Sequence, residues 1–283
     1  NIKCYGDKSI LDSFIISSKK YAEPKKEDKI ICKVLKSRYW SLLSKFDKRN
    51  IDSIFLKKDD KENIIKDLKN FLDSKESYSK FGIPYKRNYL LYGIPGTGKS
   101  SLITSLASLF NMNISIINFD PNITDTVFMN AVNTIDKNNI LILEDIDSLF
   151  TKRSMSVQNK SCVTFSGILN VLDGIVRKNN LVTFITTNYI DKLDDALIRP
   201  GRIDYKLKFD YSTKYQIKNM YKIFFPNKKN FKTFYDKIKR YNLTTSTLQK
   251  FYFENLNNDN ILDKIGDLIN LSKLHNPEHN MYI

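Results

Sequence analysis

The sequence from Tyr89 to Ala107 constrains the fold more than any other part of the chain. An apolar stretch, Tyr89–Tyr92, precedes the run Gly93-Ile94-Pro95-Gly96-Thr97-Gly98-Lys99-Ser100, and an amphipathic stretch that predicts a helix follows it. Strand, G-x-x-x-x-G-K-[ST] loop (Walker A) and helix in this order are typical of a loop that wraps the phosphates of a nucleoside triphosphate. Glycines let the backbone N–H groups turn inward, and the helix start adds its positive dipole end.

The same loop indicates the residues that bind nucleotide and metal. Lys99 supplies a positive charge for the outer phosphates, and the Ser100 hydroxyl is placed to bind Mg²⁺, so ATP and Mg²⁺ are the expected cofactors. A plain glycine turn is the alternative. The residues expected to bind the nucleotide are Gly93, Pro95, Gly96, Thr97, Gly98, Lys99, Ser100 and Ser101.

Strands and helices alternate after Asn88, which predicts an α/β core with a parallel five-stranded sheet. We expect strands at 89–92, 114–119, 140–143, 182–186 and 206–209, and helices at 99–110, 123–135, 164–176 and 194–198. The third and fourth strands are apolar almost throughout, as central strands covered on both faces are. Beyond Phe209 the strand signal stops, and 214–225, 231–241, 245–253 and 260–273 predict a C-terminal α-helical lid subdomain.

The front of the chain predicts a truncated α+β piece. It has a helical pattern over 9–21, a strand over 30–35, a linker over 44–50, a short extended piece over 51–56 and a helix over 59–72. We therefore expect three domains: a partial N-terminal α+β domain at 1–48, the nucleotide-binding core at 49–210 and the lid at 211–283.

Composition limits the environment and the partners of the chain. The net charge of +15 would suit a protein that binds a nucleic acid. The lysines are scattered along the chain, however, as in proteins from AT-rich genomes, so we favour genome composition as the origin of the charge. Three distant cysteines suggest no disulfide framework and hence a reducing compartment. No apolar stretch of about 18 residues is present. The first residue is Asn1, so a membrane or targeting segment upstream stays open.

A second cluster of polar residues follows the apolar strands (Walker B). Glu144 and Asp145 end the strand at 140–143; we expect Glu144 to hold Mg²⁺ and Asp145 to polarise the attacking water. Asn188 follows the next strand and is expected to contact the γ-phosphate or the water. A solvated acidic strand end and a plain Asn turn are the alternatives.

Arg199 and Arg202 flank a Pro-Gly turn that fixes their directions. Rigid guanidinium groups suit the charge of a transferring phosphoryl group. Because they lie far along the chain from their own phosphate loop, we expect them to reach the loop of a neighbouring copy. A surface pair of salt bridges is the alternative.

Together these motifs resemble an AAA ATPase, with Arg199 and Arg202 at both arginine-finger positions. The similarity narrows to the Bcs-type subfamily, the mitochondrial inner-membrane translocase that inserts the folded Rieske iron–sulfur protein, and extends from about Lys29 to about Pro226. The segments that carry it are Ile51-Asp52-Ser53-Ile54, Phe81-Gly82-Ile83-Pro84-Tyr85-Lys86-Arg87-Asn88-Tyr89-Leu90-Leu91-Tyr92-Gly93, Leu143-Glu144-Asp145-Ile146-Asp147 and Thr164-Phe165-Ser166-Gly167-Ile168-Leu169-Asn170-Val171-Leu172-Asp173-Gly174.

The resemblance implies an ATP-hydrolysing chaperone or translocase. It would form a homo-oligomeric ring, a hexamer or heptamer, with the nucleotide between subunits and a protein client. The subfamily's membrane helix and most of its middle domain are missing from this sequence, so membrane anchoring would need a segment outside it. The composition suits a large DNA virus or an AT-rich protist, so neither the client nor the compartment carries over.

Two other functions stay open. An AAA protein that acts on nucleic acid, such as a loader or helicase partner, would use its excess of Lys and Arg to contact the phosphates of the nucleic acid. A non-hydrolysing scaffold is disfavoured by the intact acids and arginines.

Two segments lie where AAA rings have loops that face a central pore. The segment Asn118–Asn122 lacks the aromatic-apolar-Gly triplet with which many such rings thread an unfolded chain. The segment Thr151–Lys160 is basic and polar, and it suits either a second pore-facing loop or a solvated surface loop.

Overall fold

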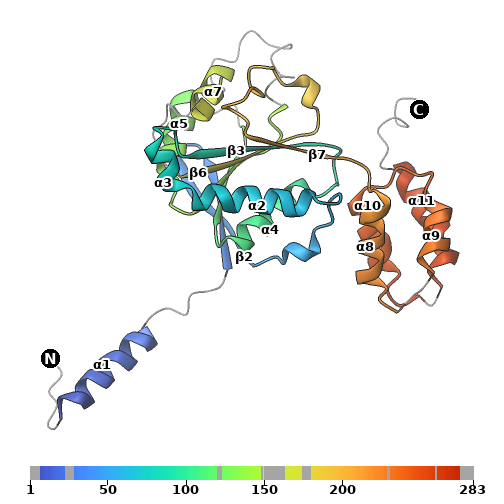
Figure 1. Ribbon diagram of the computed structural model, residues 1–283, viewed down its shortest axis with the longest axis horizontal. Coiled ribbons are helices and arrows are strands. Elements are labelled where there is room, and N and C mark those ends of the chain that lie inside the picture. Colours follow the sequence, from blue (N-terminus) through green and yellow to red (C-terminus); the bar gives the residue numbers. More distant parts are fainter. Residues whose placement is uncertain are drawn as a thin grey trace.

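A seven-stranded sheet in the order β2-β1-β4-β5-β6-β3-β7 organises the core (Figure 1). The computed structural model describes residues 7–22, 29–119, 123–147, 149, 163–173, 180–227, 230–258 and 260–274. The strands are β1 (Lys29–Lys36), β2 (Tyr39–Asp47), β3 (Lys86–Gly93), β4 (Asn113–Ile117), β5 (Asn139–Leu143), β6 (Leu181–Thr187) and β7 (Tyr205–Phe209). Residues 120–122 and 151–160, on which the loop expectations fall, lie outside the described residues.

The expected parallel strands are confirmed, and the sheet is wider than predicted. Strands β4, β5, β6, β3 and β7 pair in parallel, and β1 adds a further parallel strand beside β4. Strand β2 pairs antiparallel with β1 up to the pair of Lys29 with Asp47, so the predicted linker over 44–50 is wrong for most of its length. Backbone pairing extends this strand through side chains that are mostly polar. The front strands thus belong to the core sheet, while the three-domain division stays a prediction.

Helices cover the two faces of the sheet. Helices α2 (Asp60–Asp73) and α4 (Lys99–Leu109) pack on one face against Tyr89 and Leu91, whereas α5 (Asp125–Thr134) and α7 (Phe165–Asp173) pack on the other against Leu90. Every residue of β5 and β6 is buried. Side chains alternate across each strand, so both layers bury apolar surface, which is the main stabilising contribution. Short helix α3 (Lys75–Lys80) follows α2.

Two local predictions differ from the structure. The segment at 194–198 forms turns, because the Asp194 side chain accepts a hydrogen bond from the Ala196 N–H at 2.8 Å and Pro200 restricts the residue before it. The only helical turn next to it is η3 (Ile190–Lys192). The extended piece at 51–56 begins instead with η1 (Ile51–Ser53), whose first turn the Asn50 side chain caps.

The helical lid beyond β7 has its own apolar core. Its elements are α8 (Lys214–Phe224), α9 (Phe231–Ile238), α10 (Thr245–Glu254), η4 (Ile261–Lys264) and α11 (Ile265–Leu274). Thr213 caps α8 in a reciprocal pair with Gln216. Phe55 packs against the lid core, and the Gln216 amide donates to the Phe55 carbonyl at 3.0 Å, so the lid is attached to the core at this segment as well as through β7.

Helix α1 (Lys8–Ala22) stands away from the rest of the chain (Figure 1). Its apolar side chains Ile10, Phe14 and Ile16 are each more than half exposed. Among the helices that the structure describes, none combines the length and the apolar character needed to cross a bilayer.

The lid core offers a matched test of buried hydroxyl groups. Within the described residues, the fully buried Tyr252 hydroxyl has no hydrogen-bond partner, whereas the Tyr221 hydroxyl donates to Asn230. Since an unsatisfied buried polar group destabilises the fold, Tyr252→Phe should raise the free energy of unfolding by about 1 kcal/mol. Tyr221→Phe should lower it by about 1 kcal/mol. Urea denaturation of the two variants measures both, and a loss of stability in Tyr252→Phe would contradict the assignment.

Candidate functional site

The glycine-rich loop connects the end of β3 to the start of α4. Gly93 has a φ of 121°, and a Cβ on it would lie 2.0 Å from the Phe209 carbonyl oxygen of the neighbouring strand β7. Only glycine fits there, because the backbone must approach β7 this closely. Helix α4 begins at Lys99, so its N-terminus faces the turn of the loop.

Lys99 lies at the centre of the site and is almost fully buried. Its Nζ donates to the carbonyl oxygens of Gly93 at 2.7 Å and Ile94 at 3.1 Å, and to Asn188 Oδ1 at 2.8 Å. Burial holds the pKa of Lys99 below its ordinary value, while the carboxylates of Asp145 and Asp147 act in the opposite direction. The ammonium group is therefore held by its own loop and by the end of β6.

The two predicted acids follow β5 and differ in environment. Glu144 Oε1 accepts a hydrogen bond from the Ser100 hydroxyl at 3.4 Å, and burial, helped by the charge of Asp145, raises the pKa of Glu144. Asp145 is exposed and has a φ of 47°, which is uncommon outside glycine. Its N–H donates to the Thr186 hydroxyl at 3.1 Å, so this turn is tied to β6.

These side chains surround an open cavity of about 400 Å³. It gathers most of the predicted site from the loop, from the end of β5 and from the end of β6. Gly93 and Thr97 do not line it, and the Thr97 hydroxyl donates to the Ile94 carbonyl at 2.6 Å. The lining residues are Pro95, Gly96, Gly98, Lys99, Ser100, Ser101, Glu144, Asp145, Thr186 and Asn188.

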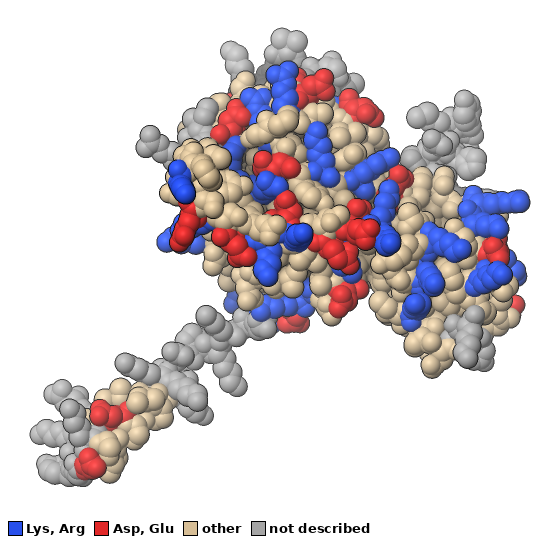
Figure 2. Space-filling view, in the orientation of Figure 1, with Lys and Arg blue, Asp and Glu red and all other residues tan. Residues whose placement is uncertain are grey.

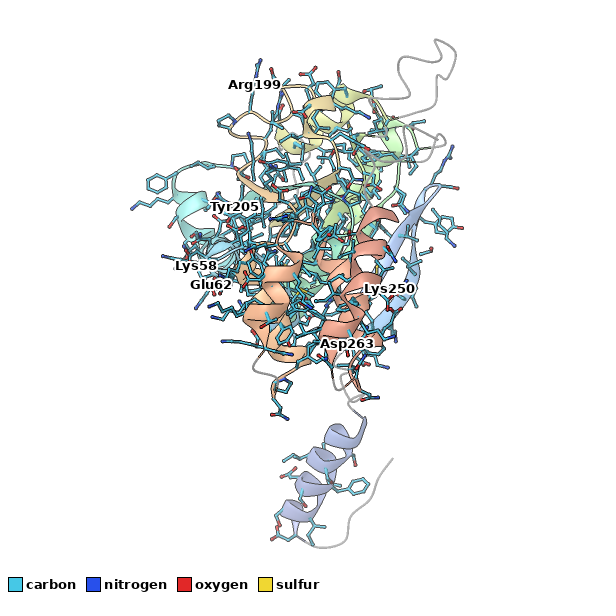
Figure 3. The ribbon with its side chains drawn as sticks, turned by 90° about the vertical axis from the view of Figure 1, so that its right-hand side faces the viewer. Lys58, Glu62, Arg199, Tyr205, Lys250 and Asp263 are labelled. Atoms are coloured by element: carbon cyan, nitrogen blue, oxygen red, sulfur yellow. The ribbon has the colours of Figure 1, made fainter. Side chains whose placement is uncertain are left out.

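The two predicted arginines lie away from this cavity and differ from each other. Arg202 donates to both oxygens of Asp173, at 2.7 and 2.9 Å, and to the Ala196 carbonyl at 2.7 Å. This pair lowers the pKa of Asp173. Arg199 is exposed at the end of the core far from the lid (Figure 3), and no described residue gives its guanidinium a hydrogen bond or ion pair.

The lid contacts the phosphate loop directly, which the sequence did not indicate. The Ser246 N–H donates to the Gly96 carbonyl at 3.0 Å, and the Thr245 hydroxyl reaches the same oxygen at 3.3 Å. Thr245 and Gln249 of α10 and Met220 of α8 face Arg49 and 53–55 across a small pocket behind the loop. No local motif marks these lid residues; of the segments around this pocket, only Ile51-Asp52-Ser53-Ile54 and the glycine-rich loop belong to the motifs described from the sequence.

The comparisons with known proteins agree with these motifs. Residues 89–211 match the family model "ATPase family associated with various cellular activities (AAA)". The chain is 35% identical over 257 residues to probable mitochondrial chaperone BCS1-B of Dictyostelium discoideum, covering 80% of this chain and 56% of that protein. It is 37% identical over 186 residues to mitochondrial chaperone BCS1 of Homo sapiens, covering 63% and 44%.

A plant protein extends the same set. AAA-ATPase At2g18193 of Arabidopsis thaliana is 36% identical over 187 residues, covering 62% of this chain and 37% of that protein. The chain thus spans about half the length of the mitochondrial chaperones that it matches, or less. The family match includes β3 with its loop, the acids after β5 and both arginines. Residues 89–211 are therefore an AAA domain, and the chain is similar to chaperones of the Bcs type over a longer stretch.

Proposed function

We propose that this chain hydrolyses ATP at a site completed by a neighbouring copy and uses the reaction to remodel or translocate a protein client. The observation that carries this proposal is the cavity in which Lys99, Ser100, Glu144, Asp145 and Asn188 meet. A cation, two carboxylates and an amide at the carboxyl ends of parallel strands are the set that phosphoryl transfer to water requires.

Binding of the triphosphate would use the loop and Lys99. The backbone N–H groups of the loop and of the first turn of α4 supply donors to an anion. The Lys99 ammonium donates to the carbonyls of Gly93 and Ile94 and to Asn188. On binding, it would exchange some of these hydrogen bonds for hydrogen bonds to the outer phosphates. The pocket behind the loop, between Phe55 and Met220, has a volume of only about 30 Å³, so a base that binds there would have to widen it.

The oxygen donors of Ser100 and Glu144 fit Mg²⁺. They lie 3.4 Å apart beside the loop, and hydroxyl and carboxylate oxygens are the ligands that this ion prefers. When bound, Mg²⁺ would neutralise charge on the phosphate oxygens. Asp145 would accept a hydrogen bond from the attacking water and then its proton, while the Asn188 amide orients the phosphate end.

Arg199 is our candidate for the residue supplied to the next copy. Its guanidinium is exposed and bound by no described residue, whereas the guanidinium of Arg202 is engaged by Asp173 within the same chain. We infer that Arg202 holds the turn that presents Arg199. This arrangement requires a closed ring, which we propose to be a hexamer or heptamer.

The client is proposed to be a protein. The relatives from Dictyostelium discoideum and Homo sapiens are named mitochondrial chaperones, and this supports a chaperone role. In Figure 2, Lys and Arg side chains are spread over the core and the lid with Asp and Glu between them, so this face carries no single basic patch. A nucleic-acid partner is therefore the weaker candidate.

Lys99→Ala should weaken ATP binding by at least an order of magnitude, because the variant loses the charge that faces the outer phosphates. Equilibrium titration with a fluorescent ATP analogue measures the loss. Lys206→Ala, which removes an exposed lysine of β7 that does not line the cavity, is the matched control and should keep near-normal affinity.

Asp145→Asn should bind ATP normally but lower kcat by about 10²–10⁴-fold, since the amide cannot accept the proton of the attacking water. Phosphate release under saturating ATP reports kcat, and the same titration reports affinity. Unchanged turnover would refute the role of Asp145.

Arg199→Ala should lower kcat by about 10³-fold with little change in nucleotide affinity, because the lost charge acts only on the transferring phosphoryl group. Mixing it with Lys99→Ala should restore part of the activity in mixed rings, where an intact arginine meets an intact loop. Arg202→Ala should instead lower the melting temperature. No restored activity at any mixing ratio would exclude action in trans.

A further inference from the structure

Asp147 is a buried carboxylate beside the site that takes no part in the reaction proposed above. Its side chain is 9% exposed, and it lies two residues beyond the exposed Asp145. Glu144 and Asp145 line the cavity, whereas Asp147 of the same segment does not. A buried carboxylate is costly unless hydrogen bonds compensate for lost hydration, so its contacts indicate its role.

The contacts of Asp147 lead to the end of β6. Its Oδ1 accepts a hydrogen bond from the fully buried Thr187 hydroxyl at 2.7 Å and a longer one from the Asn188 N–H at 3.4 Å. The Thr187 hydroxyl oxygen in turn accepts from the Tyr189 N–H at 3.1 Å. The carboxylate thus bonds Thr187 and Asn188 directly and Tyr189 through Thr187, at the point where the strand ends.

Asn188 is the middle residue of this turn and the one that meets Lys99. Its Oδ1 lies 2.8 Å from Lys99 Nζ. The position of the Asn188 side chain depends on the backbone torsions of the turn after β6, so these torsions must be fixed if the amide is to stay at Lys99. Hydrogen bonds to charged acceptors are the stronger kind, so a carboxylate fixes such a turn better than a neutral group would.

We propose that Asp147 is a positioning residue, which fixes the turn after β6 so that the Asn188 amide stays at Lys99 and at the phosphate end of the cavity. This inference rests on the proposed ATPase function and assigns a role in it to the third acid of the segment. Asp147 does not line the cavity; it acts on the turn through its hydrogen bonds to Thr187 and Asn188, and its charge also favours the protonated form of Lys99.

The experiment is a mutant cycle in the full chain between Asp147→Ala and Asn188→Ala. A displacement of about 1 Å in a positioning group can cost about 10²-fold in rate, so Asp147→Ala should lower kcat by about that factor and change KM much less. In the Asn188→Ala background, Asp147→Ala should lower kcat far less, because the amide that it positions is gone and only its charge effect on Lys99 remains.

Conservative variants separate positioning from folding. Thr187→Ser keeps a hydroxyl at the contact and should keep kcat within about threefold of the unmodified chain. Asp147→Asn keeps an acceptor oxygen but loses the charge, so its kcat should lie between those of the unmodified chain and Asp147→Ala. If Asp147→Ala does not fold, Thr187→Val removes the same link with little change in shape and should show the same loss of kcat. Melting temperatures are measured for every variant.

Three outcomes would overturn the inference. They are unchanged kcat in both Asp147→Ala and Thr187→Val, an equal loss of kcat with and without Asn188, and a loss only of melting temperature. These outcomes leave the proposed function intact, because the unmodified chain still hydrolyses ATP. Absence of hydrolysis by the unmodified chain would instead refute the proposed function and this inference with it.

Discussion

The parallel pairing of β5, β6 and β3 is the constraint on which the rest of this molecule depends. In this register Tyr92 lies beside Thr187, and Leu143 lies beside Ile185. Parallel strands end on the same edge of a sheet, so the residues that follow them must converge there. The glycine-rich loop, Glu144 with Asp145, and Asn188 come from distant parts of the sequence and meet for this reason alone. A shift of one residue would turn these strand ends to the opposite face.

Much of this arrangement was predictable because the signals are local. The loop and its flanking strand and helix form one continuous motif, and the acids follow an apolar strand that must be central. The five parallel strands were therefore predicted and found. The family was predicted from the same residues, and the comparisons agree with it.

The remainder was not predictable because it depends on contacts between distant segments. Ser44–Asp47 has a polar, loop-like sequence, yet it is a strand because Lys29–Cys32 pairs with it. Asp194–Ile198 has a helical apolar spacing, but a side-chain hydrogen bond and a following proline stop the helix. The lid residues near the loop carry no motif; they reach it because Phe55 and Gln216 attach the lid to the core and because Thr244 caps the start of α10. The sequence also could not show that Arg202 pairs with Asp173 while Arg199 stays exposed, because Asp173 is distant from both arginines along the chain.

The contact between the lid and Gly96 has a consequence for the loop itself. A methyl group on Gly96 would lie 2.6 Å from the Ser246 hydroxyl oxygen, and its φ of 72° already disfavours other residues. The same glycine therefore satisfies two unrelated demands: a tight bend of the loop, and clearance for helix α10. A substitution here would disturb the lid even with no nucleotide bound, so a variant of Gly96 would report on subdomain docking as much as on phosphate affinity.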